Sequence, residues 1–193
     1  MLNAPGAAIA ASATHTFQVR LNAASTGAFS GSVTVNSNDA DEAAFDFPVS
    51  GTVQNAPFHN WAAGSGLSGA DLAPLANPAG DGVENLLKYA FNMNPTVPDV
   101  DPLVPGTGTS GLPAYATTGS GASSFFRYEF IRRIGSGLIY TPKKSPDLLN
   151  WSSLSSTPTV TAIDANWERV VHLEPFDGTV VAELFGMVEV TLP

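Results

Sequence analysis

The chain of 193 residues has no cysteine. This absence excludes disulfide frameworks, zinc–thiolate and iron–sulfur sites, and catalysis by a thiol. Basic residues are also scarce, because 8 Lys and Arg stand against 17 Asp and Glu and the net charge is −9. A protein that binds duplex nucleic acid needs a basic surface, so we expect no nucleic-acid partner. The acidic composition suits an extracellular or cation-rich setting instead.

Long hydrophobic runs are absent as well. No apolar run approaches the ~18 residues that a helix needs to cross a membrane, so we expect no membrane partner. Residues 1–13 end in small side chains, but they contain no basic residue and Pro5-Gly6 interrupts them. Such a segment is a poor match to a signal peptide and is typical of a linker or strand remnant of a longer polypeptide.

What the chain does contain favours a mainly β fold. Hydrophobic residues make up 44% of the sequence, which is sufficient for a packed core. The 18 glycines and 15 prolines indicate many turns and short strands. In residues 1–55, apolar and polar side chains alternate with period two over 16–21, 29–35 and 45–53. We expect an antiparallel meander there.

The next part of the chain, residues 56–98, has helical character. Residues 82–91 form the strongest helix candidate, with apolar side chains on one face. We expect Lys88 to face solvent. The side chains expected to be buried are Leu86, Leu87 and Phe91.

The remainder of the chain divides into a linker and a second β region. Residues 99–123 are rich in Pro, Gly, Thr and Ser, so we expect a loop or linker. Residues 124–193 return to strand patterns. The expected strands are Phe125–Arg133, Leu138–Lys143, Thr159–Ile163, Glu168–Leu173 and Met187–Leu192.

A first family resemblance lies in the N-terminal third. Residues 12–19, 37–42 and 45–53 carry a pattern like SND-x-D/E-x-x-x-F-x-F-x-x-x-G. This pattern resembles the C-terminal half of the immunoglobulin-like choice-of-anchor D (ASH/Hydin-type) repeat. The resemblance implies an immunoglobulin-like half repeat over residues 1–55, in which the opening strands of the repeat are missing.

A second resemblance covers residues 61–95. Residues 77–90 read N-P-A-G-D-G-V-E-N-L-L-K-Y-A. They resemble the calcium-loop pattern D-x-D-x-D-G-x-x-N-L-L-E-Y-A of large secreted bacterial proteins, similar to thrombospondin type 3 and dockerin loops. The stretches at Arg132-Arg133 and 145–151 look like the β-rich tail that commonly follows such loops. The resemblance implies an exported protein and no catalytic residues.

Together these observations give a domain organisation. We expect two small β-sandwich-like units joined by a short helical calcium-loop module. The expected parts are the immunoglobulin-like half repeat at 1–55, the helical calcium-loop module at 56–98, the linker at 99–123 and the β-rich C-terminal unit at 124–193.

The calcium loop departs from the full ligand pattern. Calcium takes six to eight oxygens, with an acidic residue at loop position 12. Counted from Asn77, position 3 is Ala79 and position 12 is Lys88. The expected metal ligands are Asn77, Asp81, the carbonyl of Val83, Glu84 and Asp71. The alternative is a simple turn in which Asp81 precedes the next helix, whose N-terminus favours its charge.

Catalytic motifs are mostly excluded. Residues 106–111 match G-x-G-x-x-G, but prolines flank them instead of a strand and a helix, so a flexible linker explains them. His15, His59 and His172 are too far apart in sequence to form a short metal-binding motif. If the chain is a hydrolase, a bound calcium that activates water is the most economical mechanism.

The aromatic residues allow a further function. They could form a platform that stacks on sugars, or they could pack in the core, which we favour. The residues concerned are Trp61, Trp151, Trp167, Tyr115, Tyr128 and Tyr140.

The leading functional hypothesis is a calcium-associated structural or adhesion module of a larger extracellular bacterial protein, secreted or at the cell surface. The alternatives are a small calcium-dependent hydrolase of an ester or lactone, and a carbohydrate-binding module. Expected partners are domains of the parent protein or a cell-surface polymer. A homodimer is also expected, because a half sandwich over residues 14–53 leaves an apolar face that a second copy would cover.

Overall fold

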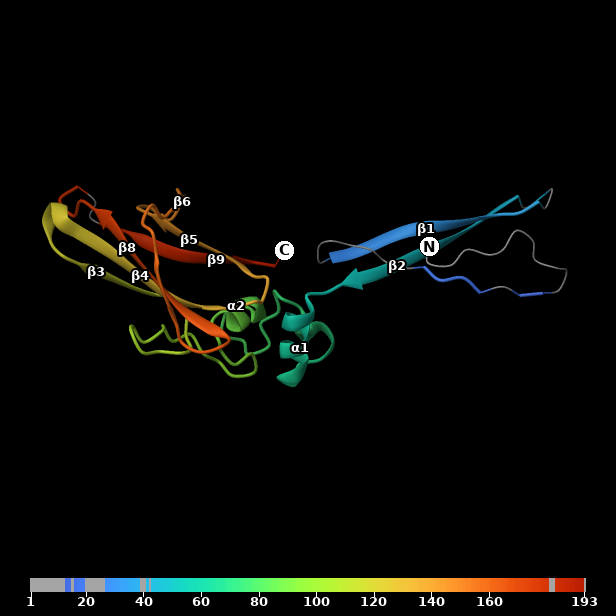
Figure 1. Ribbon diagram of the computed structural model, residues 1–193, viewed down its shortest axis with the longest axis horizontal. Helices are drawn as coiled ribbons and strands as arrows, with labels where there is room; N and C mark the ends of the chain where they lie inside the picture. Colours follow the sequence, from blue (N-terminus) through green and yellow to red (C-terminus); the bar gives the residue numbers. More distant parts are fainter. Residues whose placement is uncertain are drawn as a thin grey trace. The chain divides into compact units, whose positions relative to one another are not determined.

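The computed structural model describes residues 13–14, 16–19, 27–38, 41, 43–180 and 183–192. It divides the chain into two compact units, an N-terminal unit of residues 1–54 and a C-terminal unit of residues 55–193. Antiparallel sheets dominate both units, so the expected mainly β fold is confirmed (Figure 1).

The N-terminal unit is built on a long hairpin. Strands β1 (Gly27–Asn36) and β2 (Ala44–Val53) pair antiparallel, with Val33 opposite Phe47. Because side chains alternate across a strand, this register places the apolar residues on one face and the Ser, Thr and Asp residues on the other. Phe17 adds to the apolar face, since its ring centroid lies 6.0 Å from that of Phe47. Of the expected strand at 16–21, residues 16–19 are described and form no strand beyond the single bridge residue Gln18.

The C-terminal unit begins with short helices. Helix α1 (Ala56–Gly64) starts at Asn55, whose Oδ1 accepts a hydrogen bond of 3.0 Å from the Phe58 N–H and so caps the helix. The 3₁₀ helix η1 (Gly69–Leu72) and helix α2 (Asn85–Ala90) follow. The expected helix at 82–91 is therefore confirmed at its centre, but α2 is shorter than the pattern indicated.

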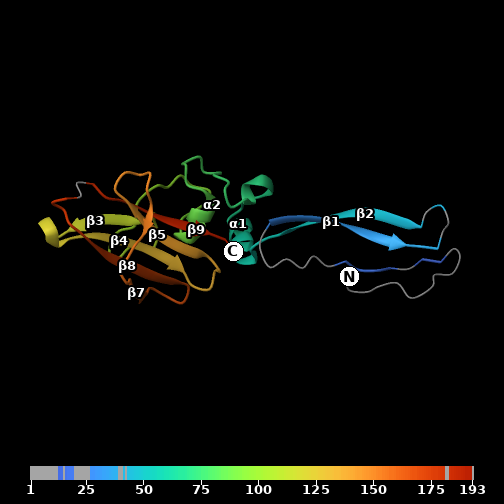
Figure 2. The ribbon, with the colours of Figure 1, turned by 90° about the horizontal axis from the view of Figure 1, so that it is seen from above.

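Two antiparallel sheets make up the rest of this unit (Figures 1 and 2). One has four strands in the order β3-β4-β8-β7, and the other has three in the order β6-β5-β9. A second 3₁₀ helix, η2 (Gly121–Ser123), precedes β4. All five expected strands are confirmed, whereas β3 and β6 were not expected. The strand bounds are β3 (Ala114–Thr118), β4 (Ser124–Arg133), β5 (Ile139–Ser145), β6 (Ser152–Ser153), β7 (Thr159–Ala162), β8 (Trp167–Phe176) and β9 (Phe185–Thr191).

A single core joins both sheets to the helices. Alternate residues of β4 face it and pack with Val188 and Val190 of β9. Helix α2 adds Tyr89 and its C-cap Phe91 to the same cluster, and α1 adds Phe58. The contributing residues of β4 are Phe126, Tyr128 and Phe130. The helical segment therefore belongs to the same compact unit as the C-terminal strands, rather than connecting two separate sandwiches.

The segment expected as a linker is also part of the fold. Leu103 is only 1% exposed and packs with Ile131 and Trp167 in a second cluster on the outer face of the four-stranded sheet. Its backbone N–H bonds to the Leu112 carbonyl at 2.7 Å, which closes the loop on itself. The expectation of a loop or linker over 99–123 needs correction at two places, because Leu103 is buried and Ala114–Thr118 forms strand β3.

None of the helices found in the described residues has both the length and the apolar character that a membrane crossing requires.

Candidate functional site

The loop that resembles a calcium site closes on itself through Asp81. Gly80 and Gly82 flank Asp81 with φ angles of 70° and 86°, a left-handed conformation that glycine adopts without a steric cost. The Asp81 N–H donates to Asn77 Oδ1 at 3.3 Å, and Asp81 Oδ1 accepts from the Val83 N–H at 2.9 Å. The structure thus brings together Asn77, Asp81 and Val83, but Val83 contributes its N–H to Asp81 and not its carbonyl.

Lys88 reaches this carboxylate from α2. Its Nζ lies 2.5 Å from Asp81 Oδ2 and 2.9 Å from the Val97 carbonyl oxygen, and its side chain is 0% exposed. The expectation that Lys88 faces solvent is therefore wrong. An ammonium group can be buried when a carboxylate and further oxygens replace its water, and the sequence pattern of α2 alone does not reveal those oxygens.

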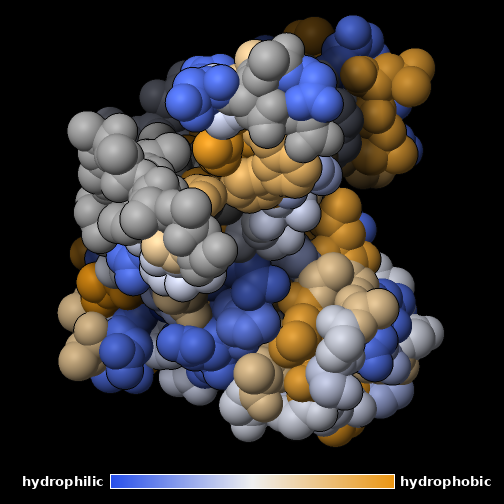
Figure 3. Space-filling model, turned by 90° about the vertical axis from the view of Figure 1, so that its right-hand side faces the viewer, coloured by the Kyte–Doolittle hydropathy of each residue, from blue (hydrophilic) through white to orange (hydrophobic). Residues whose placement is uncertain are grey.

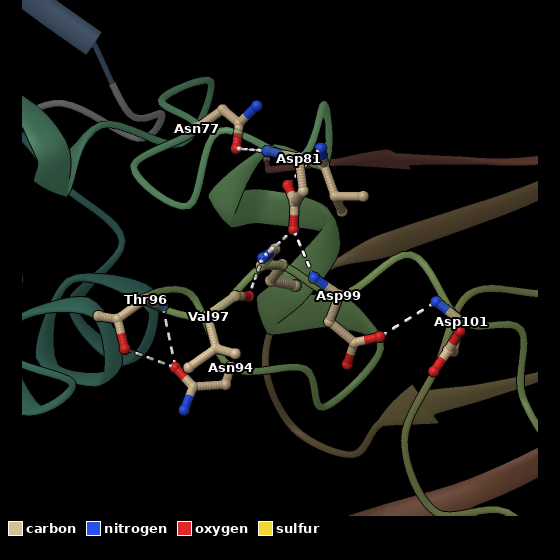
Figure 4. A network of polar contacts seen from close by, with 9 residues as sticks. Asn77, Asp81, Asn94, Thr96, Val97, Asp99 and Asp101 are labelled. Carbon is tan, nitrogen blue, oxygen red and sulfur yellow. Dashed lines mark hydrogen bonds and ion pairs between the residues drawn. The ribbon is translucent and has the colours of Figure 1, made fainter.

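Asp81 also accepts a hydrogen bond from the loop that follows α2. Asp81 Oδ2 accepts a hydrogen bond of 2.8 Å from the Asp99 N–H, so one carboxylate connects its own turn, α2 and the segment at 97–99 (Figure 4). Burial alone would raise the pKa of Asp81, but the bonds from Lys88, Asp99 and Val83 outweigh it and lower that pKa to about 2. Asp81 is therefore ionised, and Lys88 is its counter-charge.

The two remaining expected ligands take other roles. Asp71 contributes its backbone carbonyl, which accepts a 2.7 Å hydrogen bond from Asn85 Nδ2. Glu84 is the residue before α2, and its carbonyl accepts from the Lys88 N–H at 3.1 Å. Among the described residues, these acids do not join Asp81 in a group of three that could hold a metal ion.

As they stand, these residues do not fit a calcium ion. Both oxygens of Asp81 accept from N–H donors, and the position-12 residue brings a cation instead of an acid. This geometry favours the alternative of an Asp81-centred turn ahead of α2. Calcium at this loop stays a prediction of the resemblance.

A second buried carboxylate holds the following loop. Glu129 of β4 is fully buried, and its Oε1 accepts from the Gly106 N–H at 2.6 Å and from Arg169. Oε2 forms an ion pair with Arg127 without the alignment of a hydrogen bond. Arg169 also donates to the Gly108 carbonyl at 2.6 Å. Burial opposes the charge, but these partners hold the pKa of Glu129 below its ordinary value.

Glu129 also explains the glycine-rich motif. Gly106 and Gly108, which belong to the G-x-G-x-x-G match, bond to Glu129 and Arg169 in a loop that lies against the outer sheet face. In the structure no strand precedes this segment directly and no helix follows it. The motif is a tethered loop and not the flexible linker that we expected.

A third buried carboxylate holds the segment between β6 and β7. Glu174 of β8 is fully buried and lies 2.5 Å from Lys144 Nζ. Its Oε2 accepts from the N–H groups of Ser155 and Ser156 at 2.9 and 2.8 Å. Burial again opposes the charge, but these bonds outweigh it and lower the pKa of Glu174 to about 2.

The three carboxylates share one arrangement, in which each binds a cationic side chain and the N–H of a loop. We call Asp81, Glu129 and Glu174, each with its cation and loop N–H groups, the three carboxylate ties.

The nearest approach to a catalytic pair lies beside the third tie. His172 Nδ1 is 3.2 Å from Ser156 Oγ but also 3.0 Å from the Ser156 carbonyl oxygen. A carbonyl only accepts, so the bond to it needs a proton on Nδ1, and a protonated Nδ1 cannot take the hydroxyl proton. Burial lowers the pKa of His172, so the ring is neutral at pH 7. Ser156 therefore has no base at Nδ1, and His172 is a buried strand histidine.

His59 is partly buried in α1, and His15 lies outside the described residues.

Most of the aromatic residues pack inside the C-terminal unit. Tyr128 is fully buried, and Trp167 is buried beneath the Arg133 guanidinium, whose carbon lies 4.3 Å from the ring. The ring centroid of Trp61 lies 5.1 Å from that of Tyr89, and the Tyr140 hydroxyl donates to the Ala90 carbonyl at 3.1 Å. The prediction of core packing is confirmed for Tyr128 and Trp167.

Tyr115 and Trp151 are more accessible. Tyr115 is 41% exposed, with its ring against those of Phe126 and Tyr128. Trp151 is partly exposed and donates its indole N–H to the Leu148 carbonyl at 3.1 Å.

Sequence reasoning missed the three ties as a set. The available signal was a charged residue among apolar neighbours: Lys88 in N-L-L-K-Y-A, and Glu129, two positions after Arg127, in F-R-Y-E-F-I. Such residues are almost never fully buried unless they are paired, but their partners lie elsewhere in the chain.

Comparisons of the chain with protein-family models, with curated proteins and with solved structures found no match.

Proposed function

We propose that the chain is a structural or adhesion module of a larger extracellular bacterial protein. The observation that carries this proposal is that its buried carboxylates bind the backbone of loops. In each of the three carboxylate ties, an ionised side chain binds a cation and the backbone N–H of a loop. These groups stabilise loops, and the charge of each carboxylate is balanced by a lysine or arginine side chain.

Fixed loops suit a module whose role is to present a surface. Loops usually vary in conformation, but a loop whose N–H groups bond to buried carboxylates keeps one conformation. The segment between α2 and β3 is held twice, by Asp81 and by Glu129, and the segment between β6 and β7 is held by Glu174. The acidic composition and the two family resemblances support an exported setting.

Hydrogen exchange tests the structural part of this proposal. The amides of Asp99, Gly106, Ser155 and Ser156 lie outside the helices and strands, yet each donates to a carboxylate. We expect them to exchange slowly, like amides of β4 and β8. Exchange at the rate of an unstructured peptide would show that the loops are not fixed and would remove the basis of the proposal.

Turnover assays test the enzyme alternative. The wild-type chain and Ser156→Ala are incubated with nitrophenyl esters and lactones, with calcium and with EGTA. We expect no turnover above the buffer rate in any arm. Turnover that EGTA abolishes would support the calcium-dependent hydrolase, and turnover that Ser156→Ala abolishes would support a serine hydrolase; either would overturn the proposal.

A binding assay tests the carbohydrate alternative. Retention of the wild-type chain on insoluble polysaccharide, lost in Trp151→Ala and kept in the buried-site control Trp167→Phe, would favour a carbohydrate-binding module over a structural one.

A further inference from the structure

The ammonium group of Lys88 lies where the loop needs a cation. The Asp81 side chain is 4% exposed and carries a charge, and an unpaired buried carboxylate is strongly destabilising. Lys88 Nζ is its counter-charge at 2.5 Å, delivered from position 12 of the loop counted from Asn77. In a calcium loop, position 12 provides an acid to a bound ion. Here position 12 provides the positive charge itself.

The oxygens around this ammonium are of the kinds that a calcium ion selects. Calcium binds carboxylate and backbone carbonyl oxygens at about 2.3–2.6 Å. Lys88 Nζ contacts a carboxylate oxygen of Asp81 and the backbone carbonyl of Val97, the latter at 2.9 Å. An ammonium group has three protons to donate, so both contacts are hydrogen bonds as well as charge interactions.

The contacts also connect three segments that are separate in sequence. Asp81 lies in the turn before α2, Lys88 lies in α2, and Val97 and Asp99 lie in the loop after it. The Asp99 N–H donates to the same Asp81 oxygen that contacts Lys88 (Figure 4). One buried ion pair thus fixes the turn, the helix and the start of the long loop against each other.

From this geometry we infer that the C-terminal unit uses an internal ammonium group in place of a metal ion, so that its loop folds without calcium. The inference does not depend on whether the chain is an adhesion module or an enzyme. It concerns the cation that closes the loop. Because Lys88 is part of the chain, its positive charge is present at any free calcium concentration.

Thermal melts of the full chain with excess calcium chloride and with EGTA test the inference directly. We expect the same melting temperature in both conditions for the wild-type chain. By mass action, an ion that binds the folded state but not the unfolded state raises the melting temperature. A rise of several degrees in calcium would overturn the inference and support the calcium loop.

A substitution series tests the role of Lys88 itself. Lys88→Met keeps an unbranched side chain but leaves Asp81 buried without its cation, so we expect the melting temperature to fall by about 10 °C. The matched control is Lys143→Met. Its ion pair with Glu189 keeps contact with water, with side chains 27% and 45% exposed, so we expect the melting temperature to change by less than about 2 °C.

The double variant Asp81→Asn/Lys88→Met keeps the test decisive if Lys88→Met fails to fold. Removing both charges removes the unpaired carboxylate, so the double variant is expected to melt at a higher temperature than Lys88→Met alone. If instead the two substitutions lower the melting temperature additively, the two residues act independently and the inference is wrong.

Discussion

The Lys144 ammonium lies 2.5 Å from a carboxylate oxygen of Glu174, and the two side chains differ in exposure. Glu174 is fully buried, whereas 26% of the Lys144 side chain is exposed. The lysine therefore keeps part of its hydration, while the carboxylate depends on protein donors. Ser155 and Ser156 provide those donors through their backbone N–H groups. The stability of the fold is consequently sensitive to the charge on Glu174 and much less to that on Lys144.

This arrangement predicts acid sensitivity. The hydrogen bonds lower the pKa of Glu174 from 4.5 to about 2 in the folded state. Because the folded-state pKa is below the unfolded one, Glu174 contributes stability that is fully present above about pH 4.5 and is lost as the pH falls toward 2. Urea unfolding across this range should show the free-energy difference between wild type and Glu174→Gln shrink as the pH falls. A difference that stays constant with pH would contradict the assignment.

The core of the helical segment gives a second prediction. Leu86 is 7% exposed, while Leu87, which the sequence pattern also placed in the core, is only partly buried. Leu86→Ala should lower the free energy of unfolding by ~2–5 kcal/mol, and Leu87→Ala by less. Leu149→Ala, at an 83% exposed position, is the control and should stay within ~0.5 kcal/mol. Equal effects at all three positions in chemical denaturation would contradict the packing of α2.

A close approach of β9 to two tyrosine rings gives a third prediction. A methyl group added at Gly186 would overlap the Tyr128 ring and would lie 2.7 Å from Tyr115 Cε1. Gly186→Ala should therefore destabilise the fold by ~1–3 kcal/mol through overpacking. The same substitution at Gly64, which has open space around it and no positive φ, is the control and should change stability little. Thermal unfolding of both variants measures the difference.

Introducing acidic residues into the loop gives a fourth prediction. Ala79 and Lys88 occupy positions 3 and 12 of the loop, where a calcium loop carries acids. Ala79→Asp/Lys88→Glu should therefore bind calcium and melt at a higher temperature in calcium than in EGTA. Isothermal titration with calcium chloride measures the binding, and wild type is the control with no expected heat. Failure of the double variant to bind would show that the loop lacks the geometry of a calcium site.

The apolar face of the N-terminal hairpin underlies the fifth prediction. Phe45 is 61% exposed and Val19 is 47% exposed, and hydrophobic side chains also reach the surface on the side drawn in Figure 3. A two-stranded hairpin is marginal alone, and a large apolar face favours association. We expect light scattering to give twice the 20.0 kDa chain mass at high concentration. Phe45→Lys should return the mass to that of one chain.

A constant mass of 20.0 kDa for the wild-type chain up to high micromolar concentration would rule out the homodimer. The apolar face would then have to be covered within one chain or by a different protein.

Local patterns in the sequence were sufficient to locate most of the strands. The period-two alternation of residues 29–35 and 45–53 recurs in β1 and β2, because the side-chain direction in a strand depends on the residue's own position. The same reasoning placed five of the seven strands described in the C-terminal unit. It missed β3, because Ala114–Thr118 lies between proline and glycine-rich stretches that are typical of loops.

Part of the candidate site could also be read from the sequence, but its electrostatics could not. Asn77, Asp81 and Val83 lie close together in the chain, so the turn itself brings them into contact. The burial of Lys88 depends in addition on the Val97 carbonyl, and the loop that carries Gly106 reaches Glu129 across 23 positions. Sequence spacing thus determined which residues form the turn. Only the tertiary structure decided which charges are buried, because a charge leaves water only where distant parts of the chain supply its partners.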